Sequence, residues 1–361
     1  MGGSVQIPAA ALASALLDCG DMPLIETSVR AIERATASRG YRNAVTARWF
    51  PEVTPEVQRT YDLLGGSQWV PMELVRLILG VPGHTKRLVA LEQNGEPWAL
   101  VPVRLVDSYW EPMLFSVVAG AQPFLCHRNR GLVFAKLGIA LRAWESELRA
   151  SECAGVRWSE DIPWRDVIVS EDPEPYWRST ELWKTIIQAK RRTQQFELVM
   201  DDLDSAKWTI EGWRDRFADG AGRGPTTLWR ERVEVAEWGL TNGAMHCWAL
   251  KDGERWVAGS TGFVQEGRLS LGTIYRDPAY GWHGAGNRIL YETFMWARDS
   301  GLERATIGGH FAYKKRWAPI TSIRSQILVA PWLAAAVLGA SQRGGQLLHR
   351  ASPLLRGGTS R

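Results

Sequence analysis

Cysteine is scarce in this chain of 361 residues, which has only Cys19, Cys126, Cys153 and Cys247. The four lie far apart and form no CxxC pair, so the sequence shows neither zinc-ligand spacing nor the paired pattern of a disulfide framework. No other metal-ligand spacing is present. We therefore expect free, buried thiols in a reducing compartment, and no bound metal.

Long hydrophobic runs are also lacking. The longest, residues 7–17 and 329–338, fall well short of the roughly 18 residues that a transmembrane helix needs. No basic residue precedes the first run, so it does not have the pattern of a secretory signal. We expect a cytoplasmic protein without a membrane span.

Neither sign of charge dominates, since 43 Lys and Arg face 39 Asp and Glu, for a net charge of +4. That balance permits an anionic ligand without demanding nucleic acid, and we expect no DNA partner. The GxxxxGK[ST] motif of P-loop nucleotidases is absent. No Ser/His/Asp or Cys/His set can be assembled for nucleophilic catalysis either.

Tryptophan, by contrast, is abundant, with 19 residues in a chain that is 45% hydrophobic and 23% charged. This composition is typical of a folded protein, and the length allows two domains. The indole ring buries a large area and needs one hydrogen-bond acceptor, so we expect most of these rings in cores or along grooves.

The order of predicted elements indicates two α/β units. In the first, the Asn94-Gly95 turn predicts a hairpin between strands at 87–93 and 97–106. Helical spacing of apolar residues then predicts an amphipathic helix over 132–150. A basic helix over 175–196 leads to the second unit.

The second unit is predicted to hold two helices and then a three-stranded meander over 245–275. A helix from about 285 to 300 and a strand at 304–307 follow it. A last strand is expected at 322–330.

An internal similarity supports two related halves. ALEQNGEPWAL begins at residue 90 and ALKDGERWVAG at residue 249, and Glu96 and Trp98 match Glu254 and Trp256 at one offset. We expect an α/β (α+β) fold with two similar halves, each a mixed, largely antiparallel sheet flanked by helices. The expected parts are a helical lead-in at 1–44, a first half at 45–170, a linking basic helix at 171–196, a second half at 197–320 and an extension with a loose basic tail at 321–361.

The loop Gly284-Ala285-Gly286 opens the helix predicted from 285. Unpaired N–H groups and the helix dipole favour phosphate at such a place, and glycines let a ligand approach the backbone. A full GxGxxG is not present, because Ile289 fills the last position, and the loop follows a meander rather than a βαβ unit, which argues against a dinucleotide site. The alternative is a plain strand-to-helix turn.

A second candidate lies at 308–317, after the strand at 304–307. Gly308 and Gly309 precede His310, Tyr313 and Lys314, side chains that can position an anion or handle a proton. The alternative is a turn with solvated lysines and core aromatic residues.

Three other groups have ordinary structural explanations. The basic residues of 184–192 could line an entrance for phosphates, or simply form a solvated helix face. His246 lies in a strand pattern and is interpreted as a satisfied core histidine. Arg276-Asp277, at a strand end, is interpreted as part of a turn.

Residues 276–317 resemble the C-terminal GNAT domain of the acyltransferases named for cellulose biosynthesis, the CelD/BcsL type. That group is related to the Fem-type aminoacyl transferases. The resemblance extends over about 176–318 and is only general over 45–170. The positions that carry it are Asp277-Pro278, Gly286, Leu290, Gly301-Leu302, Gly309, Tyr313-Lys314 and Trp317. In the acyl-CoA signature Gln/Arg-x-x-Gly-x-Gly/Ala, Gly284 and Gly286 fit, whereas Gly281 stands at the first position.

The resemblance implies an N-acyltransferase that moves an acyl group from acyl-CoA or acetyl-CoA to an amine on a small molecule or an envelope precursor. Ile274 would lie on the strand whose amides polarise the acyl carbonyl. His310 is the expected base, Tyr313 the acid for the leaving group and Lys314 a contact for an anionic group. The residues expected to hold the donor phosphates are Trp282, His283, Gly284, Ala285, Gly286 and Asn287.

Other donors and roles stay open on this resemblance. An acyl-carrier protein could replace CoA. A Fem-like enzyme would use aminoacyl-tRNA and would be marked by co-purifying RNA and salt-sensitive tRNA binding. A catalytically silent GNAT-like binding or scaffold protein is the third possibility, supported by Gly281.

Overall fold

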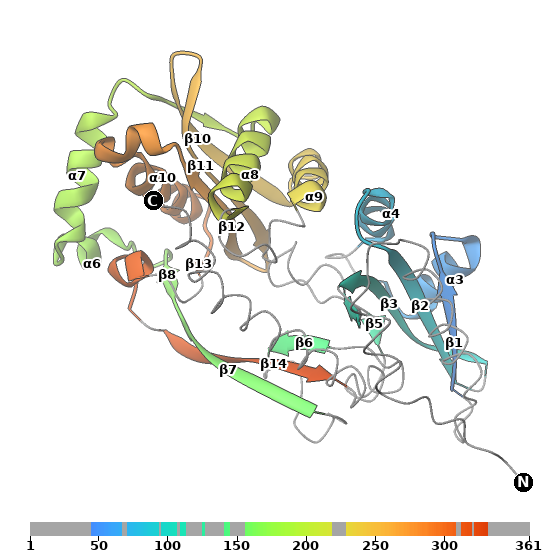
Figure 1. Cartoon of the computed structure of the whole chain (residues 1–361). Helices are drawn as coiled ribbons and strands as arrows, with labels where there is room; N and C mark the ends of the chain where they lie inside the picture. Colours follow the sequence, from blue (N-terminus) through green and yellow to red (C-terminus); the bar gives the residue numbers. More distant parts are fainter. Residues whose placement is uncertain are drawn as a thin grey trace, which may run out of the picture.

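The chain folds into mixed α/β units in which helices flank antiparallel sheets (Figure 1). The computed structural model describes residues 45–66, 71–93, 95–106, 109–112, 125–126, 141–144, 156–218, 229–307, 312–319 and 321–330. The predicted lead-in at 1–44 and most of the expected tail lie outside these residues. Within them, no helix reaches the length and hydrophobicity that a membrane crossing requires.

The first sheet has five antiparallel strands in the order β1-β2-β3-β4, with β5 paired to β3. The predicted hairpin is confirmed, since Gln93 pairs with Glu96 in the antiparallel register of the two strands. The elements of this unit are β1 (Val45–Phe50), α3 (Pro55–Leu63), α4 (Met72–Gly80), β2 (Lys86–Gln93), β3 (Glu96–Val106), β4 (Tyr109–Pro112) and β5 (Leu125–Cys126).

The second sheet has six strands in the order β8-β13-β12-β11-β10-β9. All neighbours are antiparallel except β12 and β13, which are parallel. The predicted meander and the strand after it are confirmed. The strands are β8 (Asp166–Ile168), β9 (Glu197–Met200), β10 (Met245–Asp252), β11 (Arg255–Gln265), β12 (Arg268–Arg276) and β13 (Arg304–Thr306).

Helices cover both faces of the second sheet (Figure 1). On one face, Trp248 of β10 meets Trp296 of α10 (Ala285–Asp299) edge to face at 5.0 Å. On the other face, Gly259 of β11 leaves room for Thr209 of α8, because a Cβ there would lie 1.9 Å from the Thr209 hydroxyl. The two helices of this second face are α8 (Leu203–Ala218) and α9 (Trp229–Thr241).

The basic segment before β9 is two helices rather than one. α6 (Glu174–Arg178) and α7 (Leu182–Arg192) are separated at 179–181, so the prediction of a continuous helix over 175–196 is wrong there. The Thr180 hydroxyl accepts a hydrogen bond from the Leu182 N–H at 3.3 Å. A side chain that satisfies a backbone donor in this way favours a new helix start over continuation of the old helix.

A third sheet joins segments that are far apart in the sequence. Its order is β6-β14-β7, from β6 (Leu141–Trp144), β14 (Ser322–Ala330) and β7 (Val156–Trp164). The strand predicted at 322–330 is confirmed, whereas the helix predicted over 132–150 is wrong at Leu141–Trp144. Backbone pairing with a distant strand decides the structure there, and helical spacing within a local window does not reveal it.

The two similar hairpins share an irregularity as well as a turn. In β2–β3 the register shifts after Leu91, and in β10–β11 it shifts after Leu250, the equivalent residue. A β-bulge at the same place in both supports a common arrangement. When the two hairpins are aligned on the bulge, however, Trp98 is equivalent to Val257 and not to Trp256. The structural alignment thus differs by one residue from the alignment of the sequences.

The first unit packs against the second through α4 and α9 (Figure 1). One apolar cluster includes residues of both units. Its members from the first are Val57, Met72, Leu74, Val75, Ile78, Leu88, Ala90 and Leu100, and from the second Ala206, Ile210, Val235, Ala236, Met245, Cys247 and Phe263. The shared core holds the two units together by apolar burial.

A buried ion cluster lies at the same contact. The Glu231 carboxylate of α9 is 3.2 Å from the Lys86 ammonium of β2 and 3.3 Å from an Arg104 guanidinium nitrogen of β3. All three side chains are almost completely buried.

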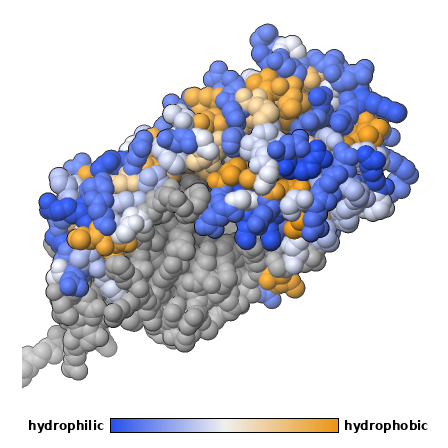
Figure 2. Space-filling view, turned by 180° about the vertical axis from the view of Figure 1, so that it is seen from behind, coloured by the Kyte–Doolittle hydropathy of each residue, from blue (hydrophilic) through white to orange (hydrophobic). Residues whose placement is uncertain are grey.

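In the view from behind, hydrophilic residues cover much of the described surface and hydrophobic residues form separate patches between them (Figure 2).

Candidate functional site

The edge of β12 is the first feature of the candidate site. β13 pairs with β12 only at Arg268, Leu269 and Ser270. β12 continues to Arg276, and no other strand of the described residues pairs with it on that side. Residues 271–276 therefore offer an open strand edge.

Two backbone N–H groups of β12 point to this open edge. The Thr273 N–H donates to the Thr261 hydroxyl of β11 at 3.1 Å, and the Asp277 N–H donates to the Val257 carbonyl at 2.9 Å. Because pairing directions alternate along an antiparallel strand, the amides of Ile274 and Arg276 face away from β11. An acyl carbonyl lying along the edge could accept a hydrogen bond from the Ile274 amide.

A short turn connects this strand to α10. The 3-10 helix η4 (Pro278–His283) starts at Asp277, whose carboxylate accepts the Ala279 N–H at 2.8 Å. Gly284 then adopts φ +76°, and a Cβ there would lie 3.0 Å from the Ala189 Cβ of α7. Glycine at 284 is therefore explained by backbone conformation and helix packing, whether or not a ligand binds.

Only some of the amides expected to hold phosphate are unengaged. The Gly284 N–H donates to the Gly281 carbonyl at 3.4 Å and the Asn287 N–H to the Gly284 carbonyl at 2.8 Å. Among the described residues, no backbone acceptor is found for the N–H of Ala285 or of Gly286. These two amides, at the positive end of a helix of 15 residues, are the ones that a ligand could use.

The Arg276 guanidinium lies beside this loop. A Cβ on Gly281 would lie 3.0 Å from an Arg276 guanidinium nitrogen, and one on Gly286 would lie 3.7 Å from its Cδ. Within the described part of the chain, the Arg276 side chain makes no ion pair or hydrogen bond. Gly281 thus lacks a side chain where a guanidinium from the preceding strand is located.

Sequence reasoning assigned Arg276 to the turn and missed this placement. The signal that could have found it is its position as the last residue of the strand, immediately before the loop. The neighbouring residues differ in exposure: Trp282 of η4 is exposed and His283 is half-buried. The side chain of Ala285 is fully buried, so only its backbone amide is available to a ligand.

The second candidate loop is described in part. His310, with Gly308 and Gly309, lies outside the described residues. Tyr313 and Lys314 lie in the 3-10 helix η5 (Ala312–Arg316). Burial lowers the pKa of Lys314 to about 8. At neutral pH this amine therefore exchanges its proton more readily than an ordinary lysine.

Tyr313 is partly exposed, with 42% of its surface accessible. Burial raises the pKa of its phenol, and the Arg216 guanidinium of α8 opposes that rise. Arg216 acts in the same way on Tyr275 of β12, whose pKa burial also raises. Both phenols thus lie within the electrostatic influence of Arg216, and each stays protonated at neutral pH.

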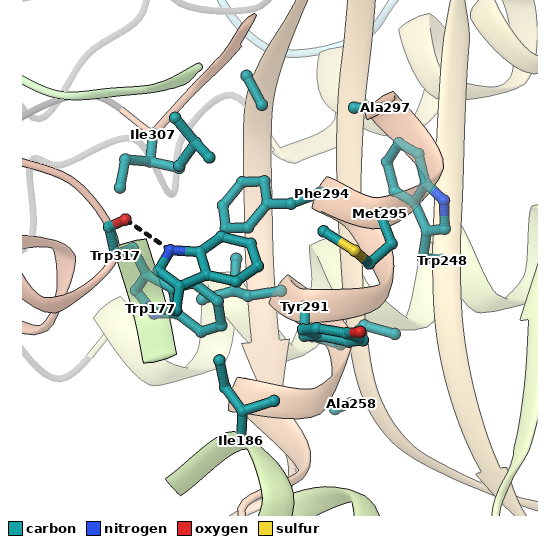
Figure 3. Packing of buried hydrophobic residues seen from close by; sticks show 14 of the residues in the cluster. Trp177, Ile186, Trp248, Ala258, Tyr291, Phe294, Met295, Ala297, Ile307 and Trp317 are labelled. Carbon is teal, nitrogen blue, oxygen red and sulfur yellow. Dashed lines mark hydrogen bonds between the residues drawn. The ribbon is translucent and has the colours of Figure 1, made fainter. Parts of the chain in front are cut away.

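Trp317, which closes the same segment, belongs to the core. Its side chain is 1% exposed, and its carbonyl accepts the Trp177 indole N–H at 2.9 Å (Figure 3). Phe294 of α10 packs on both rings. This part of the family-like motif holds η5 against α6 and α10.

Other sequence interpretations can be placed as well. His246 is hydrogen-bonded to Asp201 at 3.0 Å and stacks on Trp296, as expected of a satisfied histidine. Cys247 is a buried free thiol beside Ser205, and burial raises its pKa to about 12. Across the described ranges, no cluster of His, Cys, Asp or Glu has the make-up of a metal site.

Comparison with known proteins identifies the second unit. Residues 180–315 match the family model described as Acetyltransferase (GNAT) domain. No curated protein matches the chain. This region, from α7 to η5, therefore corresponds to a GNAT acetyltransferase domain, but the match does not single out the cellulose-biosynthesis type.

Several solved structures are similar at low sequence identity. FemX is 8% identical, with 77% of this chain and 96% of that chain covered and a TM-score of 0.43. L-PGS from Bacillus licheniformis is 11% identical, with 83% and 98% covered and a TM-score of 0.47. A tandem GNAT protein from the clavulanic acid biosynthesis pathway is 10% identical, with 79% and 98% covered and a TM-score of 0.44. These identities are too low to transfer an activity.

Proposed function

We propose that this protein transfers an acyl group from a coenzyme A thioester to an amine. The observation that carries the proposal is the open edge of β12, residues 271–276, which the short helix η4 connects to the N-terminus of α10. A donor with a phosphate at one end and a thioester at the other can lie along both. The match of residues 180–315 to the GNAT acetyltransferase domain supports the same chemistry.

The phosphate end would be held by the loop after β12. The Arg276 guanidinium and the amides of Ala285 and Gly286 supply positive charge and hydrogen-bond donors close together. A guanidinium suits phosphate because it offers several donors in a fixed plane. In this proposal Arg276 takes the place of the side chain that Gly281 lacks.

At the thioester end, the Ile274 amide would donate to the carbonyl oxygen and stabilise the developing oxyanion. The amine nitrogen forms a bond to the carbonyl carbon, and the carbon–sulfur bond then breaks. The amine proton passes to a base, for which His310 stays the prediction and the neutral amine of Lys314 is a second candidate. The phenol of Tyr313 donates a proton to the leaving thiolate.

The acceptor would be an amine on a small molecule or on a precursor of the cell envelope, as the resemblance to the CelD/BcsL type implies. We also propose the division inferred from sequence, with a first half at 45–170 and the acyltransferase half at 197–320. A cytoplasmic location agrees with the use of a coenzyme A donor.

Calorimetry and thermal melting with acetyl-CoA, longer acyl-CoAs and free CoA test the donor. We expect wild-type protein to be stabilised by at least one of them. Arg276→Gln should weaken that binding at least about tenfold, the effect expected of a lost charge-assisted hydrogen bond.

The matched control is Arg268→Gln, which changes an exposed arginine at the other end of the same strand. It should bind the donor as the wild type does. Wild-type protein that binds none of these ligands would overturn the proposed donor.

A further inference from the structure

Trp282 is the outermost ring of an aromatic stack. Its indole is 66% exposed, and its ring centroid lies 3.5 Å from that of His283. His283 in turn lies 5.2 Å from Tyr280 and 5.6 Å from Phe196, whose side chain is buried. Phe196 also lies 5.6 Å from Tyr280, so the exposed Trp282 ring rests, through His283, on a cluster of three mutually packed rings.

α7 holds this ring in place from the side. A guanidinium nitrogen of Arg192 donates to the Trp282 carbonyl at 2.7 Å, and the guanidinium carbon lies 6.0 Å from the Trp282 ring. The last turn of α7 therefore fixes the backbone of Trp282 and places a planar cation near its indole. The exposed part of the indole does not pack against other described residues of the protein.

Two guanidinium groups lie near this residue. That of Arg192 lies near the Trp282 ring, and that of Arg276 lies beside Gly281, the residue directly before Trp282. Lys190 is directed elsewhere, since its ammonium lies over the Tyr291 ring at 4.3 Å. An exposed aromatic platform close to guanidinium groups matches the chemistry of a purine base that carries phosphates.

We propose that Trp282 and Arg192 form a stacking subsite for the adenine base of the donor, next to the phosphates at Arg276. This inference rests on the proposed function and adds to it the place where the adenine base of the coenzyme A donor binds. A phosphopantetheine arm on a carrier protein has the phosphate but not the base, so it would leave this subsite empty. Rigid support of the ring lowers the entropy that stacking would otherwise cost.

The test compares two ligands that differ by the nucleotide, CoA and 4′-phosphopantetheine, by calorimetry. Trp282→Ala should weaken CoA binding at least about fivefold, the lower end of the effect of losing one base stack. It should leave 4′-phosphopantetheine binding unchanged. Trp282→Phe should recover most of the CoA affinity, because a smaller ring still stacks.

Tyr176→Ala is the matched control, since Tyr176 is an exposed aromatic residue of α6, 40% exposed. It should bind both ligands as the wild type does. The inference is overturned if Trp282→Ala weakens the binding of both ligands equally, or weakens the binding of neither. It fails alone if wild-type protein binds CoA no better than 4′-phosphopantetheine, whereas binding of neither ligand overturns the proposed function as well.

Discussion

The indole N–H of Trp177 donates to the carbonyl of Trp317 at 2.9 Å, and the two rings meet edge to face at 5.3 Å (Figure 3). This pair ties α6, which precedes the GNAT-like region, to the segment that follows β13. Trp177→Phe removes the donor and leaves a buried carbonyl unsatisfied, together with a small cavity. We expect a loss of about 2–4 kcal/mol in the free energy of unfolding, measured with denaturant.

The neighbouring Tyr176→Phe is the control for that measurement. Its ring is exposed, so the free energy of unfolding should change by less than about 0.5 kcal/mol. A loss below about 1 kcal/mol for Trp177→Phe would contradict a structural role for the hydrogen bond.

Glu231 provides a second stability prediction. Glu231→Gln keeps the shape of the side chain but removes the carboxylate from the buried charges of Lys86 and Arg104. Breaking a buried ion cluster by removing one partner costs about 3–5 kcal/mol. Denaturant unfolding should show that loss.

Glu237 on the same helix is the matched control. It pairs with Lys207 at 3.4 Å on the surface, so Glu237→Gln should cost less than about 1 kcal/mol. Equal losses for the two substitutions would show that burial does not determine how much the Glu231 cluster contributes to the free energy of unfolding.

The two loop glycines should respond in opposite ways. Gly284→Ala meets a left-handed backbone and Ala189, so it should destabilise the fold by about 1 kcal/mol or more. Gly286→Asp meets only ordinary contact distances, and a carboxylate in the first turn of a helix is favourable. The melting temperature of Gly286→Asp should therefore be unchanged or higher, while its donor affinity falls at least about tenfold.

This pair separates structure from binding. If the Gly286→Asp protein binds the donor with wild-type affinity, the donor phosphate does not bind at the start of α10. A Gly284 substitution alone cannot make that distinction, because it disturbs packing against α7 as well.

Lys314 predicts a pH dependence of turnover. Burial lowers its pKa to about 8, so the neutral amine forms as pH rises through that value. At pH 7 about a tenth of the molecules would carry the neutral base, as follows from a pKa one unit higher. If Lys314 accepts the proton of the attacking amine, the rate should rise about tenfold from pH 7 to a plateau above 9.

Lys314→Arg is the informative variant, because it keeps the charge and cannot lose a proton at these pH values. It should abolish the rise. A wild-type profile with its inflection near 6.5, the ordinary value for histidine, would instead favour His310 as the base.

The elements that were predictable from sequence are those fixed by local chemistry. Alternation and Gly-containing turns predict β10 to β12, and the strand at 322–330 was placed with the correct bounds. The segment Leu141–Trp144 was not predictable, because its partner β14 lies far along the chain. The break at 179–181 is accompanied by a hydrogen bond to the Thr180 hydroxyl, and threonine also fits within a helix pattern.

The candidate site divides in the same way. Glycines at 284 and 286 mark a loop in any sequence window, so the position of the turn was predictable. The positive charge beside the turn was not predictable, because the Arg276 side chain reaches Gly281 only once β12 and η4 are folded. The stack under Trp282 likewise includes Phe196, which no local pattern links to η4.

β14 is the middle strand of its sheet, yet it is the last of the three to be synthesised. β6 and β7 therefore leave the ribosome without the strand that both of them pair with. Their backbone groups cannot pair with that strand until residues 322–330 are made, after the whole second unit has been synthesised. Folding of that sheet is thus a late event of high contact order, and a nascent chain stalled before 322 would present two unpaired strand edges.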